Sequence, residues 1–168
     1  IINQILDHSF DPRLEINIKN NSGTTALMIA IEHKYLDGVM TILKHPELNI
    51  NEKNIYGKTA LIIAIDDDFF EGIIEILNHP KLDINIQDEK GKTVLMVAMV
   101  NNEPKIVNQI LKRLDDFDPK LDINIQDKEN KTTLMHAMRM REPKIIKLIL
   151  DHPFDPNLNI NIQDKEGK

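Results

Sequence analysis

The sequence contains no cysteine and no tryptophan, and phenylalanine and tyrosine together make up only 4% of the chain. Without cysteine there is no disulfide framework, no thiolate metal site and no cysteine nucleophile. So few aromatic side chains do not form a stacking platform for single-stranded nucleic acid. Basic residues number 21 against 27 acidic residues, and the resulting net charge of −6 disfavours a broad phosphate-binding surface. We therefore expect no nucleic-acid partner.

Long apolar runs are also lacking. No run approaches the roughly 20 apolar residues that cross a bilayer, and no secretory leader opens the chain, so we expect a cytoplasmic protein with no membrane partner. Ile, Asn and Lys account for 61 of the 168 residues, and all three have AT-rich codons. Since the chain also starts without Met, we expect a fragment of a longer protein from an AT-rich genome, such as that of a giant DNA virus acting in the host cytoplasm.

Internal repetition organises the whole chain. An octapeptide with Thr at its third position and Ala at its last occurs four times, at 23–30, 57–64, 91–98 and 130–137. A shared Asn opens each unit, and the periods between successive units are 34, 34, 39 and 37 residues. We therefore predict one domain, 1–168, that contains a partial repeat at 1–16, repeat 1 at 17–50, repeat 2 at 51–84, repeat 3 at 85–123, repeat 4 at 124–160 and a partial repeat at 161–168.

Each unit reads as a turn followed by two short helices. In repeat 3, Gly91 supplies the positive φ of a tight turn, Thr93 is placed to cap a first helix, and Pro104 starts a second helix. Helices this short are unstable alone and must pack on their neighbours. The predicted helix pairs are 25–33 with 36–44, 59–67 with 70–78, 93–101 with 104–113, and 132–140 with 143–151.

This unit resembles the ankyrin repeat, whose signature is T-P-L-H-x-A within a period of 33. The chain reads Thr-x-Leu-Met-x-Ala or a close variant four times. The resemblance implies an all-α solenoid of helix-turn-helix units with projecting β-turn tips, used as a non-catalytic scaffold for binding another protein. It also implies that the hydrogen bond made by the signature His is absent, since that position holds Met28, Ile62, Met96 and Met135.

Small residues lead to two further predictions about helix packing. Ala64 and Ala98 occupy the Ala position of the signature, where a small side chain lets adjacent first helices approach, so both should be buried. Gly38 and Gly72 lie inside second helices, where glycine either weakens the helix locally or admits a close neighbour. Phe69 and Phe70 follow an acidic run, and both are expected in the core.

The histidines offer no catalytic or metal site. Four of them share one repeat position: His8, His45, His79 and His152. Stacked helices lie roughly 10 Å apart and metal bonds are about 2 Å long, so these histidines cannot share an ion, and we interpret them as charges that complement helix C-termini. His33 and His136 are three repeats apart, with no Ser or Cys nucleophile beside either. We expect no enzymatic activity, no metal and no cofactor.

An apolar pair marks a candidate binding surface. Ile55 and Tyr56 lie at the tip of the second turn, where every sibling repeat carries polar residues. Exposure of this pair would fit a partner-binding contact, and the alternative is that both side chains fold back onto a neighbouring tip.

Charged residues extend this candidate surface. Asp66 and Asp67 are expected to favour a partner that carries Lys or Arg, whereas Arg139 and Arg141 occupy the matching region of repeat 4. The net charge of the repeats is 0, −4, −1 and +1 in order, so the inner face runs from acidic to basic, unless this gradient is compositional noise.

These observations predict a monomeric protein–protein interaction scaffold whose partner is another protein. The alternative is a substrate-recruiting segment of a ubiquitin-ligase adaptor or effector enzyme whose other domains lie outside this chain.

Overall fold

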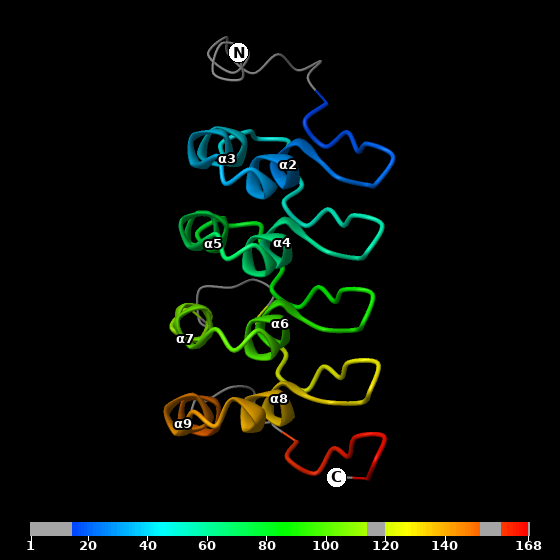
Figure 1. Ribbon diagram of the computed structural model, residues 1–168, viewed down its shortest axis with the longest axis vertical. Helices are drawn as coiled ribbons and strands as arrows, with labels where there is room; N and C mark the ends of the chain where they lie inside the picture. Colours follow the sequence, from blue (N-terminus) through cyan, green and yellow to red (C-terminus); the bar gives the residue numbers. More distant parts are fainter. Residues whose placement is uncertain (1–14, 114–119, 152–158, 168) are drawn as a thin grey trace. The chain divides into compact units, whose positions relative to one another are not determined.

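The computed structural model describes residues 15–113, 120–151 and 159–167, and in these residues the chain forms four pairs of short helices (Figure 1). The pairs are α2 (Ala26–Glu32) with α3 (Leu36–Leu43), α4 (Ala60–Asp66) with α5 (Phe70–Leu77), α6 (Val94–Val100) with α7 (Pro104–Leu111), and α8 (Thr133–Met140) with α9 (Pro143–Asp151). The predicted helix pairs are confirmed, to within one or two residues at each end. Most of the predicted partial repeat at 1–16 lies outside the described residues, together with His8 and His152.

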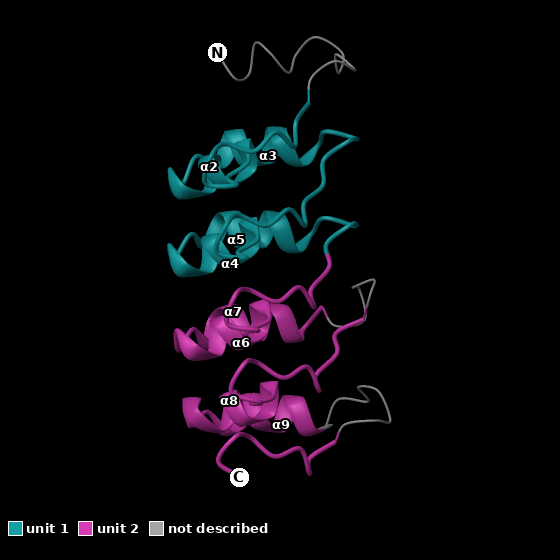
Figure 2. Ribbon diagram, turned by 90° about the vertical axis from the view of Figure 1, so that its right-hand side faces the viewer, with its two compact units in different colours: residues 1–82 teal, residues 83–168 magenta. Residues whose placement is uncertain are grey.

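The chain divides into two compact units, residues 1–82 and 83–168 (Figure 2). In the first unit, α2 packs against α4 and α3 packs against α5. In the second unit, α6 packs against α8 and α7 packs against α9. The boundary falls where the repeat pattern places the junction between repeats 2 and 3, so each unit holds two repeats, and the single domain at 1–168 stays a prediction.

A threonine starts every first helix. Its backbone is extended, and its Oγ1 accepts a hydrogen bond from the backbone N–H three residues later, with a distance of 3.4 Å in each repeat. This is the N-cap arrangement that satisfies one of the unpaired N–H groups at a helix start. The four capping residues are Thr25, Thr59, Thr93 and Thr132.

A residue with left-handed backbone ends every first helix. These residues have φ between 50° and 58°, and none is glycine; they are Lys34, Asp68, Asn102 and Arg141. In repeat 1 the next N–H, of Tyr35, donates back to the carbonyl of Ala30 at 2.9 Å, which closes the end of the helix. The chain can then turn directly into the second helix.

The loop before each first helix forms a projecting turn, which we call the finger; fingers occupy 17–24, 51–58, 85–92 and 124–131, and another begins at 159–167. In each finger an Asn or Asp Oδ1 accepts the N–H groups two and four residues later, as Asp88 does from Lys90 and Lys92 at 2.8 Å. Gly91 has φ of 75°, and Asn130 takes the same role with φ of 59°. The predicted positive-φ turn is confirmed.

No β-strand occurs within the described ranges, where the only pairing is one isolated bridge between Gln126 and Thr132. The fold is therefore all-α, as predicted. The fingers lie side by side within a unit because backbone groups join them. In the first unit the N–H of Ile55 donates to the carbonyl of Ser22 at 3.1 Å, and a side chain at Gly23 would lie 2.9 Å from the Ile55 nitrogen.

Small residues allow the helices to approach closely. Ala64 and Ala98 are fully buried, which confirms their predicted position between first helices. A Cβ added at Gly38 would lie 2.4 Å from the ring of Tyr35, and one at Gly72 would lie 2.4 Å from the ring of Phe69. Of the two explanations for these glycines, the structure therefore supports close approach of a neighbour.

The two adjacent phenylalanines differ in burial, which corrects one expectation. Phe69 is 5% exposed, as predicted for the core. Phe70 is 38% exposed, so the prediction that it belongs to the core was wrong. Phe69 precedes α5 and places its ring over Gly72, whereas Phe70 is the first residue of that helix and lies toward solvent.

Candidate functional site

The tip of the second finger presents an apolar pair to solvent. Ile55 is 54% exposed and Tyr56 is 58% exposed, so the predicted exposure is confirmed and the side chains do not fold back into a neighbouring tip. The backbone beneath them is well held, because Asn54 Oδ1 accepts the N–H groups of Tyr56 and Lys58, both at 3.0 Å. The finger thus offers apolar contact area on a preorganised turn.

Another exposed apolar residue of the fingers in this unit was missed from the sequence. Ile18, in the first finger, is 63% exposed. The next residue, Lys19, forms an ion pair with Glu52 and donates to the carbonyl of Lys53 at 3.0 Å, so it joins the first finger to the second. The repeat alignment gave no clear signal, because the equivalent residue is Glu52 in repeat 2 but isoleucine elsewhere, as Ile86, Ile125 and Ile162.

The acidic cluster at the end of α4 is exposed, as predicted, but its charge is partly compensated. Asp66 Oδ2 lies 2.7 Å from Lys58 Nζ, and Lys58 belongs to the finger that carries Tyr56. Asp67 is the C-cap residue of α4, and the Asp68 carbonyl accepts from Lys34 Nζ at 3.4 Å. The ion pair therefore connects the finger to the first helix and lowers the net negative charge that a partner would meet.

Arg139 and Arg141 are exposed in the second unit. Arg139 lies in the last turn of α8, where a positive charge interacts favourably with the helix dipole, and Arg141 caps the helix with φ of 54°. The structure thus places Ile55, Tyr56, Asp66 and Asp67 in residues 1–82 and both arginines in residues 83–168.

The histidines after the second helices act differently from the prediction. His45 and His79 accept a hydrogen bond at Nδ1 from the backbone N–H two residues later, from Glu47 and Lys81 respectively, each at 3.2 Å. A nitrogen that accepts a hydrogen bond cannot itself carry a proton. Burial, and to a smaller extent the positive charge of Lys81, lowers the pKa of His79. For His79, the expectation that the ring is a charge complementing the helix dipole was wrong, because the ring serves as a neutral turn acceptor.

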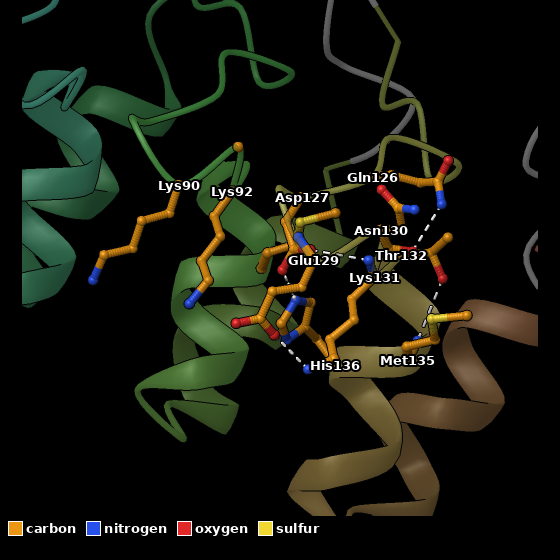
Figure 3. A network of polar contacts seen from close by, with 12 residues as sticks. Lys90, Lys92, Gln126, Asp127, Glu129, Asn130, Lys131, Thr132, Met135 and His136 are labelled. Atoms are coloured by element: carbon orange, nitrogen blue, oxygen red, sulfur yellow. Dashed lines mark hydrogen bonds and ion pairs between the residues drawn. The ribbon is translucent and has the colours of Figure 1, made fainter. Parts of the chain in front are cut away.

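A buried pair in repeat 4 also corrects the sequence analysis. His136 Nε2 lies 2.8 Å from Asp127 Oδ2, and both side chains are 2% exposed (Figure 3). From the sequence, His136 was placed three repeats from His33 with no Ser or Cys nucleophile beside it, and no partner was predicted for it. The equivalent positions in the other repeats hold Ile29, Ile63 and Val97. A polar residue at an otherwise apolar repeat position, near the finger aspartate, was the signal that could have revealed it.

Burial determines the ionisation of this pair. Burial is the largest influence on His136 and lowers its pKa, although the hydrogen bond that the ring donates to Asp127 acts in the opposite direction. Burial alone would raise the pKa of Asp127, but the N–H groups of Lys131 and Glu129 and the His136 ring together lower it. The pair is therefore a neutral imidazole that donates to a carboxylate. Because solvent does not reach either group, the pair offers a substrate no access and serves the structure of the finger.

Neither metal nor membrane features occur in the part of the chain that the structure describes. No group of three or more His, Asp or Glu side chains there is arranged to hold a metal ion. No helix in those ranges combines the length and the apolar character that crossing a bilayer demands.

Comparisons with known proteins agree on one family. A family model for ankyrin repeats, built from three copies, matches residues 1–88 and again 68–164. A crystal structure of EF0377, an ankyrin repeat protein, superposes with a TM-score of 0.75 and 22% sequence identity, over 99% of this chain and 79% of that one. No curated protein gives a significant sequence match.

Proposed function

Since the chain belongs to the ankyrin-repeat family, whose repeats generally act as protein–protein interaction modules, we propose that it is a non-catalytic scaffold that binds another protein through its fingers and the ends of its first helices. We call these segments the finger surface. In the first unit the finger surface includes the tip at Ile55 and Tyr56 and the end of α4 at Asp66 and Asp67.

One observation carries this proposal: two large apolar side chains stand exposed on a turn whose backbone is held by hydrogen bonds. An interface gains most from apolar and aromatic side chains that lose water on binding and lose little conformational entropy. Ile55 and Tyr56 meet both conditions, and the Tyr56 hydroxyl can also hydrogen-bond at the rim of an interface.

The charges beside the tip would act mainly on the rate of association. Asp66 already pairs with Lys58, so Asp67 remains the better placed carboxylate for a Lys or Arg of the partner. Exposed charges of this kind steer encounter and contribute little net affinity. The double substitution Asp66→Asn with Asp67→Asn should therefore slow association and flatten its salt dependence.

Site-specific photo-crosslinking tests the proposal. Benzoyl-phenylalanine at position 56 should give a discrete protein adduct in an extract of the native host. The same group at Glu71, an exposed position in the first turn of α5, is the matched control. Adducts of equal yield at both positions, or none at position 56, would contradict binding through this finger.

Affinity for the crosslinked partner then measures the contribution of the tip. Tyr56→Ala should speed dissociation and weaken binding by about 2 kcal/mol or more if the side chain is a central contact. The fold should be unaffected, because Tyr56 lies outside the packed helix faces. Surface plasmon resonance gives both rates, and unchanged dissociation of the variant would place the contact elsewhere on the chain.

A further inference from the structure

The second helix of each repeat has one side in the core and one side toward solvent. Its third and seventh residues are buried in all four repeats, whereas its first, second, fifth and sixth residues are half-buried or exposed. These four positions lie on one side of a helix, so they form a solvent-facing strip. Because α3 packs beside α5 and α7 beside α9, the strips join in pairs. We call the strips on α3 and α5 the outer face of the first unit, and those on α7 and α9 the outer face of the second unit.

The two outer faces carry opposite charges. The outer face of the first unit has three acidic residues and no basic residue, namely Asp37, Glu71 and Glu75. The outer face of the second unit has three basic residues and no acidic residue, namely Lys105, Lys144 and Lys147. The helix ends do not change these signs. Residues 35–44 and 69–78 together contain three acidic residues and one basic residue, whereas 103–112 and 142–151 contain four basic and three acidic residues.

The stability of α7 and α9 does not explain their lysines. Asp37 and Glu71 lie in the first turns of their helices, where a negative charge interacts favourably with the helix dipole. Lys105 and Lys144 occupy the same position of α7 and α9, where a positive charge is unfavourable. Within the described ranges none of these four side chains forms an ion pair. Binding of an acidic surface accounts for lysines at these positions.

Apolar side chains accompany the charges on both outer faces. In the first unit Met40 is 37% exposed and Phe70 is 38% exposed, and half-buried aliphatic residues lie at the matching positions of the neighbouring helix, Ile74 and Leu36. Methionine and phenylalanine are enriched in protein interfaces. In the second unit Leu148 is 42% exposed. Its position faces solvent in every repeat, because the sibling residues are half-buried polar ones, Thr41, Glu75 and Gln109.

We propose that the outer face of the first unit binds the outer face of the second unit in another copy of this chain. The acidic residues Asp37 and Glu71 then lie opposite lysines of the second copy, and Met40 and Phe70 contact its Leu148. A second copy is the favoured occupant because this chain itself carries the complementary surface, in both charge and apolar character. Two copies that make this contact twice form a closed dimer. This assembly departs from the monomer expected from the sequence.

Self-association of this kind leaves the finger surface accessible. Within each unit the first helices lie between the second helices and the fingers (Figure 1). A contact through the second helices therefore does not cover Tyr56, and one chain can bind a second copy and another protein at the same time. The inference goes beyond the proposed scaffold function and does not depend on it.

Sedimentation equilibrium of the purified chain tests self-association. The average mass should rise above the 19.4 kDa of one chain as the protein concentration increases. It should fall again as salt is added, because the facing charges are exposed to solvent. The mass of a single chain at every concentration up to about 1 mM would overturn the proposal.

Charge reversal at the second position of the second helices locates the contact. Asp37→Lys with Glu71→Lys makes both outer faces basic, and Lys105→Glu with Lys144→Asp makes both acidic. Each substitution introduces a residue type that this chain already carries at the same position of another repeat, so the helices should tolerate it. Each variant alone should self-associate at least about tenfold more weakly than the wild type, because like charges then face each other.

Mixing the two variants is the decisive step. Each face of one variant then meets a face of opposite charge on the other, so the mixture should associate about as strongly as the wild type. Both variants keep a negative net charge, so non-specific attraction does not produce this result. Failure of the mixture to associate, or wild-type association of either variant alone, would overturn the proposal.

A control variant separates location from net charge. Lys90→Glu with Lys128→Glu changes two exposed finger lysines and alters the net charge as much as the Lys105→Glu and Lys144→Asp variant does. The control should keep wild-type self-association, and a loss equal to that of the outer-face variant would overturn the proposal. Crosslinking at position 56 judges the scaffold function separately. An adduct from Glu71 to a second copy has twice the mass of the chain, which distinguishes it from an adduct with a host protein.

Discussion

The buried His136–Asp127 pair should make the second unit sensitive to acid. Asp127 Oδ1 holds the fourth finger through the N–H groups of Glu129 and Lys131, and its Oδ2 accepts from His136 Nε2 at 2.8 Å. The other ring nitrogen, Nδ1, is buried and has no hydrogen-bond partner. A proton added at Nδ1 would therefore be buried without an acceptor, near the positive charges of Lys92 and Lys131.

The sign of the effect follows from the two pKa shifts. The pKa of His136 is lowered in the folded chain, so the unfolded chain takes up a proton first, at about pH 6.5. Stability is then complete above about pH 6.5 and is lost as the pH falls toward the folded pKa, by about 1.4 kcal/mol for each pH unit of that interval. The pKa of Asp127 is also lowered, so its stabilisation is present above about pH 3.9 and is lost only in stronger acid.

Amide hydrogen exchange of α8 measures this effect locally. Between about pH 7.5 and 5, after correction for intrinsic exchange rates, the opening free energy of α8 should fall in the wild-type protein. His136→Val, which introduces the residue that repeat 3 carries as Val97, should remove that slope. The variant should also lose about 1–3 kcal/mol at neutral pH, because Asp127 loses a hydrogen bond to its charged group.

A surface histidine provides the matched control. His33 is exposed and its Nδ1 donates to the carbonyl of Ile29 at 3.0 Å, so His33→Asn removes one imidazole ring from the first unit. The pH profile of α8 should be unchanged in this variant. A His136→Val protein whose α8 amides keep the wild-type pH slope would show that the buried pair is not responsible.

Three further outcomes follow from the packing and the turns. Ala98→Leu should destabilise the protein by about 1–3 kcal/mol in urea denaturation because the fully buried site has no room, and a wild-type midpoint would contradict close helix approach. Arg141→Gly should stabilise the fold by about 0.5–1 kcal/mol, since φ of 54° strains a residue with a side chain, and a lowered melting temperature would count against this reasoning. His79→Asn should keep an acceptor for the Lys81 N–H while removing a ring with a lowered pKa, so its stability should decline less steeply below about pH 6.5 than that of the wild type, with the remaining decline due to His136. Equal pH slopes for His79→Asn and wild type would refute a neutral acceptor. His79→Ala should lose about 1 kcal/mol at neutral pH.

Local chemistry allowed most of the fold to be predicted. The threonine caps, the Asx turns and the positive-φ glycines each depend on residues within about four positions of one another, so their signals lie in short segments. Their recurrence at a near-constant period then located the helices. Asn130 aligns with three glycines in the repeat pattern, and its φ of 59° shows that it takes the same turn position.

Repeat comparison also predicted part of the candidate surface. Ile55 and Tyr56 occupy tip positions that hold polar residues in every sibling repeat. Polar residues at these positions indicate exposure to solvent, and the apolar pair is exposed as well. The same comparison does not reveal the exposed Ile18, because its equivalents in three other repeats are also isoleucine. Exposure could be read from the pattern, whereas the binding role of these residues depends on a partner.

Contacts between segments were decided by tertiary structure. The ion pair of Lys58 with Asp66 joins a finger to the far end of a helix, and no sibling repeat repeats it. His136 falls on a repeat position that is apolar elsewhere, so the pattern gave it no polar partner, and only the folding of the finger over α8 brings Asp127 to its ring. Periodicity indicates which face of an element is buried, because residues on one face recur with the period of the backbone geometry. Which polar atoms meet within the buried space depends on side chains that differ from one repeat to the next, and their pairing is determined only when the elements pack.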